Sequence, residues 1–185
     1  MLKDWNKVEQ PTAEEVDKRL ANAKNSLLQQ QIAMKEKKLP VIVLLEGWGA
    51  AGKGSVLGKL IKNIDPRFFK VAVMDEPTEE EKRKPFLYRH FVKIPEAGKF
   101  VFMDSGWMSE VTSQKLSGEL SEEEYKKRIE SIKRFERQLT DNGYLLLKFF
   151  FNIDKKEQKK RLKKLVEDKN LSLIHISEPT RLLSI

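Results

Sequence analysis

The chain has 185 residues and no cysteine, and its 36 lysine and arginine residues against 28 aspartate and glutamate residues give a formal net charge of +8. This composition excludes a disulfide scaffold, a cysteine nucleophile and a thiolate metal site, while 39% hydrophobic residues suffice for one ordinary folded domain. No apolar run approaches the ~20 residues that cross a membrane, and the first residues lack the apolar stretch of a signal peptide, so a cytoplasmic protein is expected. The positive charge favours an anionic partner, although such a charge is also common without one.

The first elements are a helix and a buried strand. We expect a helix at 12–37, because Thr12 and Glu15 have the spacing of a capping box and apolar residues recur about every 3.6 positions. Pro40 ends this element. Residues 41–45 then form a continuous apolar run rich in branched side chains. Such a run is typical of a strand that is buried on both faces of a parallel sheet.

The rest of the chain alternates helical and strand patterns. Further helices are expected at 54–63, 85–93, 106–116, 121–142 and 154–169, further strands at 69–74, 100–103 and 144–151, and a polar loop at 75–81. Strands that alternate with helices indicate a mainly parallel sheet with helices on both faces. The predicted fold class is α/β, a three-layer α/β/α sandwich.

A glycine-rich segment between the first strand and the next helix is the strongest indication of function. Residues 47–55 read Gly-Trp-Gly-Ala-Ala-Gly-Lys-Gly-Ser and fit the pattern G-x-x-x-x-G-K. In this pattern, backbone N–H groups and the positive end of the helix surround phosphate oxygens, and the lysine adds a full charge. The expected phosphate-binding residues are Gly47, Gly49, Ala51, Gly52, Lys53, Gly54 and Ser55.

This loop departs from the common pattern at one position. The residue after the lysine is usually Ser or Thr, whose hydroxyl binds magnesium, whereas here it is Gly54 and the serine follows one residue later. The alternative interpretation is a glycine-rich turn with a surface lysine. The buried strand before the loop and the helix after it disfavour that alternative.

With this loop the sequence resembles the second family of polyphosphate kinases, in which glycine after the lysine is usual. Further matching segments are Glu-Pro-Thr at 76–78, Phe-Leu-Tyr-Arg at 86–89, Met-Asp-Ser-Gly-Trp at 103–107, Arg-Phe-Glu-Arg-Gln-Leu-Thr-Asp-Asn-Gly at 134–143 and Lys-Phe-Phe at 148–150. The resemblance implies a P-loop kinase-like fold and magnesium-dependent phosphoryl transfer between inorganic polyphosphate and a nucleotide, AMP or ADP. Within this family, the sequence resembles polyphosphate:AMP phosphotransferases, some of which carry two such domains in tandem.

The resemblance also implies catalytic roles for individual residues. Lys53 corresponds to the lysine of the phosphate loop, and Arg89 corresponds to an arginine in the helix after the second strand. Asp104 corresponds to a Walker-B-like aspartate, whose carboxylate would hold magnesium against the phosphates. Without the family, Asp104 fits equally well as the N-cap of the next helix.

A helical lid is a further implication of the resemblance. The segment 106–142 is similar to helices that close over the phosphates in the family. Arg134 and Arg137 in this segment are expected to reach them. The alternative interpretation of both arginines is a solvated helix face.

Three positions around the predicted site depart from the family pattern. The family has an aspartate where this chain has Gly49, and arginines where it has Ser105 and Glu110. One acid and two cations are thereby replaced, and buried charges of this kind change rates by orders of magnitude. The alternative function is therefore a catalytically degenerate half-domain with a structural or assembly role in a tandem polyphosphate:AMP phosphotransferase.

Two further functions fit the sequence less well. A P-loop kinase that phosphorylates nucleoside monophosphates from ATP is disfavoured by the ordered family matches, and nucleic-acid binding by the lack of an interleaved aromatic and basic motif. The lysine-rich helix at 154–169 is interpreted as a solvated amphipathic face, with a polyphosphate-attracting surface as the alternative. The expected partners are polyphosphate and a nucleotide, without nucleic acid or membrane. Self-association is also expected, because the family tends to form oligomers.

The last residues break the pattern. Residues 171–185 do not resemble the family and look like the translation of a sequencing adapter, so we expect them to be non-native. The kinase-like domain then comprises residues 1–170 and is incomplete at its C-terminus, and His175 has no function. The alternative is a genuine divergent tail.

Overall fold

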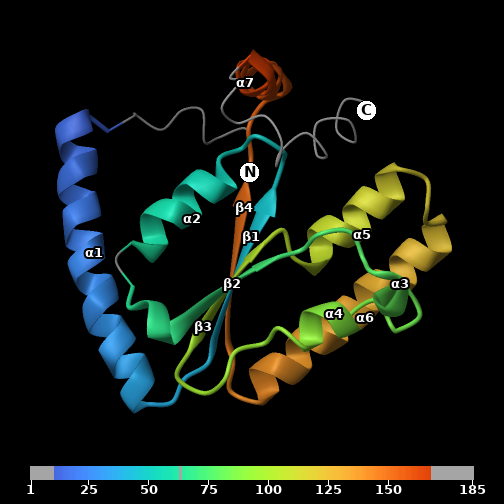
Figure 1. Cartoon of the computed structure of the whole chain (residues 1–185), viewed down its shortest axis with the longest axis horizontal. Helices are drawn as coiled ribbons and strands as arrows, with labels where there is room; N and C mark the ends of the chain where they lie inside the picture. The colour runs from blue at the N-terminus through green and yellow to red at the C-terminus, as the bar shows by residue number, and fades with distance from the viewer. Residues whose placement is uncertain (1–10, 63, 168–185) are drawn as a thin grey trace.

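A four-stranded parallel sheet is the centre of the computed structural model, which describes residues 11–62 and 64–167 (Figure 1). The order of the strands across the sheet is β2-β3-β1-β4. Their bounds are β1 Val41–Gly47, β2 Phe69–Val73, β3 Phe100–Asp104 and β4 Leu145–Phe151. The strands predicted from the sequence and the α/β fold class are confirmed.

Helices cover both faces of this sheet. They are α1 Ala13–Glu36, α2 Lys53–Ile61, the 3-10 helix η2 Pro66–Phe68, α3 Glu79–Lys82, α4 Tyr88–Phe91, α5 Trp107–Leu116, α6 Glu122–Asp141 and α7 Lys155–Glu167. In Figure 1, α1 and α2 lie on one side of the sheet and α3 to α6 on the other, while α7 lies beyond the carboxyl end of β4. The predicted three-layer sandwich is therefore present.

Two short elements differ from the sequence predictions. The segment 75–81 was expected to be a polar loop, but α3 begins in it because Thr78 and Glu81 form a capping box. The helix expected at 85–93 contains only the short helix α4. Tight turns flank it, as in the hydrogen bond of 2.8 Å from the N–H of Tyr88 to the carbonyl of Pro85.

The central strand β1 divides the core into two clusters. Val41, Val43 and Leu45 face α1 and α2, while Ile42 and Leu44 face α5 and α6. All five are at most 5% exposed, which explains the continuous apolar run in the sequence. β1 lies between β3 and β4, and this arrangement places the turn that follows β1 at the middle of the carboxyl edge of the sheet.

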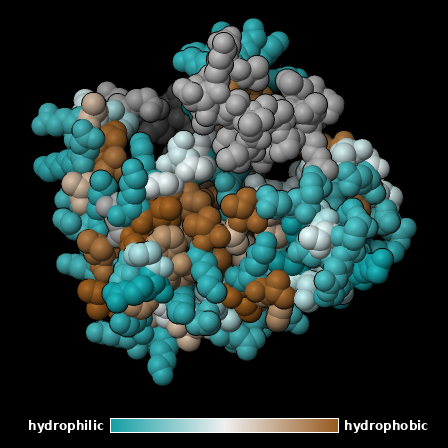
Figure 2. All heavy atoms as spheres, in the orientation of Figure 1, coloured by the Kyte–Doolittle hydropathy of each residue, from teal (hydrophilic) through white to brown (hydrophobic). Residues whose placement is uncertain are grey.

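The edge strand β4 is much more exposed than β1. Leu147, Phe149 and Phe150 are 38%, 51% and 60% exposed. Figure 2 shows a different face of the molecule, the one on which α3 and α4 lie in front, where hydrophobic residues also gather near the middle between hydrophilic helix surfaces. Among the described residues, β4 pairs only with β1.

Two expectations concern the limits of the structure. Residues 171–185 lie outside the described residues, so their interpretation as an adapter translation and the domain at 1–170 stay predictions. Within residues 11–62 and 64–167, no helix has the length and apolar character needed to traverse a bilayer.

Candidate functional site

The glycine-rich segment forms a tight turn between β1 and α2. Gly47 has a φ of +131°, and a Cβ added there would overlap the backbone of Phe151, with only 2.7 Å to its nitrogen. The N–H of Trp48 donates a hydrogen bond of 3.3 Å to the carbonyl of Phe151. The start of the loop is therefore fixed against the end of β4, and only glycine fits at its first position.

Left-handed residues bend the loop toward α2. Ala50 has a φ of 59° and Gly52 a φ of 99°, and the N–H of Ala51 donates to the carbonyl of Trp48 at 3.2 Å. Gly52 provides no side-chain cap, and the first turn of α2 contains no acidic residue. The amides of this turn consequently have no carboxylate of their own helix as an acceptor, which is the arrangement that suits a bound anion.

Lys53 lies inside this turn. Its side chain is buried, with the residue only 8% exposed. The Nζ atom donates to the carbonyls of Gly47 at 3.1 Å and Trp48 at 3.3 Å. The structure thus brings together the predicted lysine and loop, while Gly54 and Ser55 on the first turn of α2 are exposed to solvent.

Asp104 ends β3 next to the base of the loop. It is the register partner of Leu45 in β1, and the N–H of the following Ser105 donates to the Leu45 carbonyl at 3.1 Å. Ser105 has a φ of 62°, so the chain turns sharply away from the strand. The predicted metal-binding carboxylate ends β3, and the phosphate loop follows the neighbouring strand β1. Both therefore lie at the carboxyl edge of the sheet.

Glu46 was not predicted from the sequence. The residue is only 6% exposed, and its Oε2 accepts hydrogen bonds from the Ser109 N–H at 3.1 Å and from the Ser109 hydroxyl. Its Oε1 has no hydrogen-bond partner among the described residues. The one sequence signal was a carboxylate at the end of an apolar strand, directly before the first glycine.

Arg89 lies in a different environment from the phosphate loop. It is 5% exposed, and its Nη2 donates to the backbone carbonyl of Asp75. Its Nη1 is 3.9 Å from Oε2 of Glu110, the residue that stands where the family pattern has an arginine. The predicted catalytic arginine therefore connects α4 to the segment after β2 and to the first turn of α5.

The two predicted lid arginines are exposed on α6. The buried face of this helix consists of Ile132, Phe135 and Leu139, whereas Arg134 and Arg137 are exposed. This arrangement matches the alternative of a solvated helix face. A role of α5 and α6 as a lid remains a prediction.

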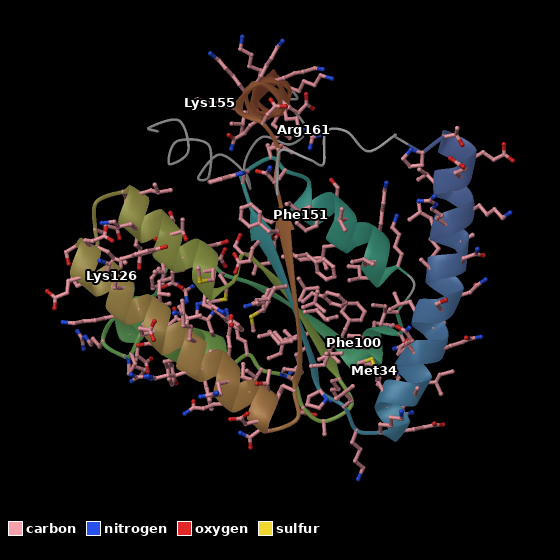
Figure 3. All side chains as sticks on the ribbon, turned by 180° about the vertical axis from the view of Figure 1, so that it is seen from behind. Met34, Phe100, Lys126, Phe151, Lys155 and Arg161 are labelled. Atoms are coloured by element: carbon pink, nitrogen blue, oxygen red, sulfur yellow. The ribbon has the colours of Figure 1, made fainter. Side chains whose placement is uncertain are left out.

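The basic helix α7 contacts the back of the loop, which sequence reasoning missed. Gln158 Nε2 donates to the Gly49 carbonyl at 3.2 Å, and Arg161 Nη1 is 3.4 Å from the carbonyls of Ala50 and Ala51. Figure 3 shows Arg161 on the side of α7 that is directed toward the loop. Part of this helix is therefore a structural support for the phosphate loop.

The metal prediction depends on few ligands. Among the described residues, no group of three or more His, Cys, Asp or Glu side chains is placed to hold a metal ion. Magnesium in phosphoryl-transfer sites is commonly held by one or two carboxylates together with substrate phosphates. A single carboxylate such as Asp104 suits that kind of site.

Comparisons with known proteins connect this arrangement to a family. Residues 10–172 match the family described as Polyphosphate kinase 2 (PPK2). ADP-polyphosphate phosphotransferase 3 of Rhizobium meliloti is 30% identical over 82% of this chain and 53% of its own length. Polyphosphate:AMP phosphotransferase of Pseudomonas aeruginosa is 33% identical over 82% of this chain and 31% of its own length.

Solved structures agree with this match. The crystal structure of polyphosphate kinase 2 from Arthrobacter aurescens TC1 superposes with a TM-score of 0.87 at 24% identity, covering 95% of this chain and 64% of that chain. This likeness supports the P-loop kinase-like fold. The chain spans about half the length of the first curated relative and a third of the second. On the family match over residues 10–172, the chain belongs to the polyphosphate kinase 2 family.

Proposed function

We propose that this domain takes part in phosphoryl transfer between inorganic polyphosphate and a nucleotide, with AMP or ADP as the acceptor. The observation that carries the proposal is Lys53, buried inside a glycine-rich turn between a central strand and a helix. The names of two relatives, a polyphosphate:AMP phosphotransferase and an ADP-polyphosphate phosphotransferase, give the substrate classes.

The loop would bind phosphates through its backbone and its lysine. The amides at the start of α2 have no acidic side chain in their own turn, so they are suited to donate hydrogen bonds to phosphate oxygens. Lys53 Nζ now donates to two backbone carbonyls. A phosphoryl oxygen is a stronger, charge-assisted acceptor than a carbonyl. The ammonium group would therefore donate its hydrogen bonds to that oxygen and stabilise the charge of the reacting phosphoryl group.

Kinases of this family are generally metal-dependent, and we propose magnesium as the ion here. The carboxylate of Asp104 would hold it beside the loop, because Asp104 and the strand before the loop are neighbours at one edge of the sheet. When bound, the ion would neutralise negative charge on the phosphates. Arg134 and Arg137 would reach the phosphates only as parts of a closed lid.

A second candidate is a degenerate half-domain with an assembly role. Gly49 leaves the loop without the family aspartate, and Ser105 and Glu110 remove two cations. In addition, Arg89 contacts Glu110 instead of being presented to solvent. This domain would retain the fold and a phosphate site and would depend on an active domain for turnover.

Formation of ADP from AMP, polyphosphate and magnesium distinguishes these functions. Lys53→Ala is expected to lower turnover by about 100-fold or more, the usual effect of losing a preorganised charge at a transition state. Lys62→Ala removes the same charge from an exposed position after α2 and should change turnover less than about twofold, within the small effect of a surface charge.

Binding of tripolyphosphate, measured by calorimetry, separates the remaining outcomes. Binding that depends on Lys53 without turnover would favour the half-domain. Turnover that survives Lys53→Ala would remove the loop from the mechanism. A folded chain that neither binds nor turns over would contradict phosphoryl transfer and phosphate binding by the loop, and would leave the assembly role as the remaining function.

A further inference from the structure

A small polar cluster lies between α4 and the first turn of α5. We define the α4–α5 cluster as Arg89, His90 and Glu110. His90 is 0% exposed and Arg89 is 5% exposed, and the Glu110 side chain is 14% exposed. Three titratable side chains in one buried contact are unusual in a domain whose predicted phosphate site lies in another loop.

One carboxylate oxygen holds both basic residues. Oε2 of Glu110 accepts a hydrogen bond of 2.9 Å from Nε2 of His90 and lies 3.9 Å from Nη1 of Arg89. His90 is itself fixed by an edge-to-face contact with Trp107, at 5.7 Å between ring centroids. Glu110 therefore fixes the position of α4 relative to α5.

The cluster leaves hydrogen-bonding capacity unused. Nε of Arg89 and Nδ1 of His90 have no partner in the described part of the chain. A buried donor without an acceptor is costly, and a guanidinium carries five N–H donors in a planar fork suited to phosphate. The contact at 3.9 Å from Glu110 does not use that fork. Arg89 would be better satisfied by an anion that accepts two of its hydrogen bonds.

The cluster and the phosphate loop lie at the same edge of the sheet. Asp75, whose carbonyl accepts from Arg89, follows the carboxyl end of β2, and α5 follows the carboxyl end of β3. The first turn of α5 also engages Glu46 through the Ser109 N–H. Two of the protein's own carboxylates, Glu46 and Glu110, thus occupy the end of α5 that favours anions.

We propose that Glu110 retains Arg89 inside the protein and so weakens the binding of phosphate chains at the carboxyl edge of the sheet. This inference rests on the proposed function, because the relevant ligand is polyphosphate. Glu110 acts in two ways: its charge opposes an incoming polyanion, and its carboxylate competes with that polyanion for Arg89.

Calorimetric titration with tripolyphosphate at constant ionic strength tests the proposal. Glu110→Gln keeps an acceptor for His90 and removes the charge, and it is expected to tighten binding by about fivefold, through local charge and the released arginine. Glu96→Gln is the matched control. Glu96 is exposed, pairs with Lys99 at 2.7 Å, and precedes the opposite end of β3, so the same change of net charge should have no measurable effect.

A double variant assigns the gain to Arg89. If released Arg89 contacts the ligand, the increase in tripolyphosphate affinity caused by Glu110→Gln is lost when Arg89→Met is added. Hydrogen exchange supplies a second readout, because amides of α4 should exchange faster in Glu110→Gln while those of α2 do not change. Thermal melting identifies variants that fold, and Glu110→Ala serves as a second neutral variant.

The outcomes separate this inference from the proposed function. Tighter tripolyphosphate binding by Glu110→Gln in a chain that never phosphorylates AMP would support the inference and count against the proposed activity. Equal affinities of a folded Glu110→Gln variant and the wild-type chain would overturn the inference, as would an equal gain from Glu96→Gln. A gain that persists in the double variant would overturn the role of Arg89.

Discussion

The side-chain amide of Gln158 donates a hydrogen bond of 3.2 Å to the carbonyl oxygen of Gly49, across 109 residues of sequence. Arg161, one turn further along α7, places Nη1 3.4 Å from two more carbonyls of the same loop. Because these side chains bond to loop carbonyls, they do not occupy any loop amide that could bind phosphate. Helix α7 therefore supports the loop, while its lysines at 155, 156, 159, 160, 163 and 164 remain exposed.

Removal of this support should loosen the loop. We expect Gln158→Ala and Arg161→Met each to lower the free energy of unfolding by about 1 kcal/mol, the usual value of one hydrogen bond. Tripolyphosphate binding should weaken as well, because the loop amides lose part of their preorganisation. Urea unfolding and calorimetric titration measure the two effects.

Lys160→Met is the matched control for Arg161→Met, since it removes one cation from an exposed position on the same helix. It should leave the free energy of unfolding within about 0.5 kcal/mol of the wild-type value. If Lys160→Met and Arg161→Met weaken binding equally, the net charge of α7 and not its contact with the loop is responsible.

Two glycines of the phosphate loop should respond oppositely to alanine. Gly47→Ala is expected to lower the free energy of unfolding by more than about 2 kcal/mol, because its Cβ overlaps the backbone of Phe151 and its φ of +131° disfavours any side chain. Gly54→Ala, with nothing within 4 Å of the added Cβ, should raise it by about 0.5 kcal/mol through higher helix propensity. Urea unfolding gives both values. Similar losses at the two positions would contradict the described geometry of the loop.

A surface carboxylate gives a prediction about pH. Hydrogen bonds from Arg67, at 3.0 Å from Nε and 2.6 Å from Nη2, lower the pKa of Asp65 from its ordinary value of 3.8 to about 2. The stabilisation from this pair is therefore complete above the ordinary pKa and is lost as the pH falls toward 2. As the pH falls from the ordinary pKa toward 2, the free energy of unfolding should accordingly decrease less in Asp65→Asn than in the wild-type chain.

Titration of the Asp65 carboxyl by NMR measures this shift directly. Arg67→Ala should return the pKa of Asp65 toward 3.8, because the guanidinium hydrogen bond is its largest cause. Arg19→Ala, which removes an exposed cation from α1, should leave the pKa of Asp65 unchanged. An ordinary pKa for Asp65 in the wild-type chain would rule out the described ion pair.

Much of the fold could be predicted because its signals are local. The capping box Thr12–Glu15 defines the start of α1 as expected, and the box Ser121–Glu124 gives the start of α6 a similar local signal. The apolar run at 41–45 correctly indicated a strand covered on both faces. The short helices α3 and α4 were less predictable, because each contains only four helical residues, too few to show a helical repeat in the sequence.

The site was predictable only where its residues are adjacent in the sequence. The loop from Gly47 to Lys53 is one continuous motif, and the structure forms it as a single turn. Glu46 and Gln158 were missed because their partners lie 63 and 109 residues away. The predicted catalytic role of Arg89 stays a prediction, and a local pattern could not reveal that Arg89 lies 3.9 Å from the carboxylate of Glu110.

The position of β1 at the centre of the sheet also affects how the chain folds. Val41 pairs with Phe100 on one side and with Leu145 on the other. The central strand can therefore complete its pairing only after two segments that are distant in the sequence reach it. Closing such long loops costs entropy before the strand contacts repay it, and parallel sheets of this kind fold slowly. During synthesis, β1 leaves the ribosome early with its apolar side chains uncovered. The chain is therefore most exposed to aggregation until β4 has been made, and slower growth at low temperature should favour soluble expression.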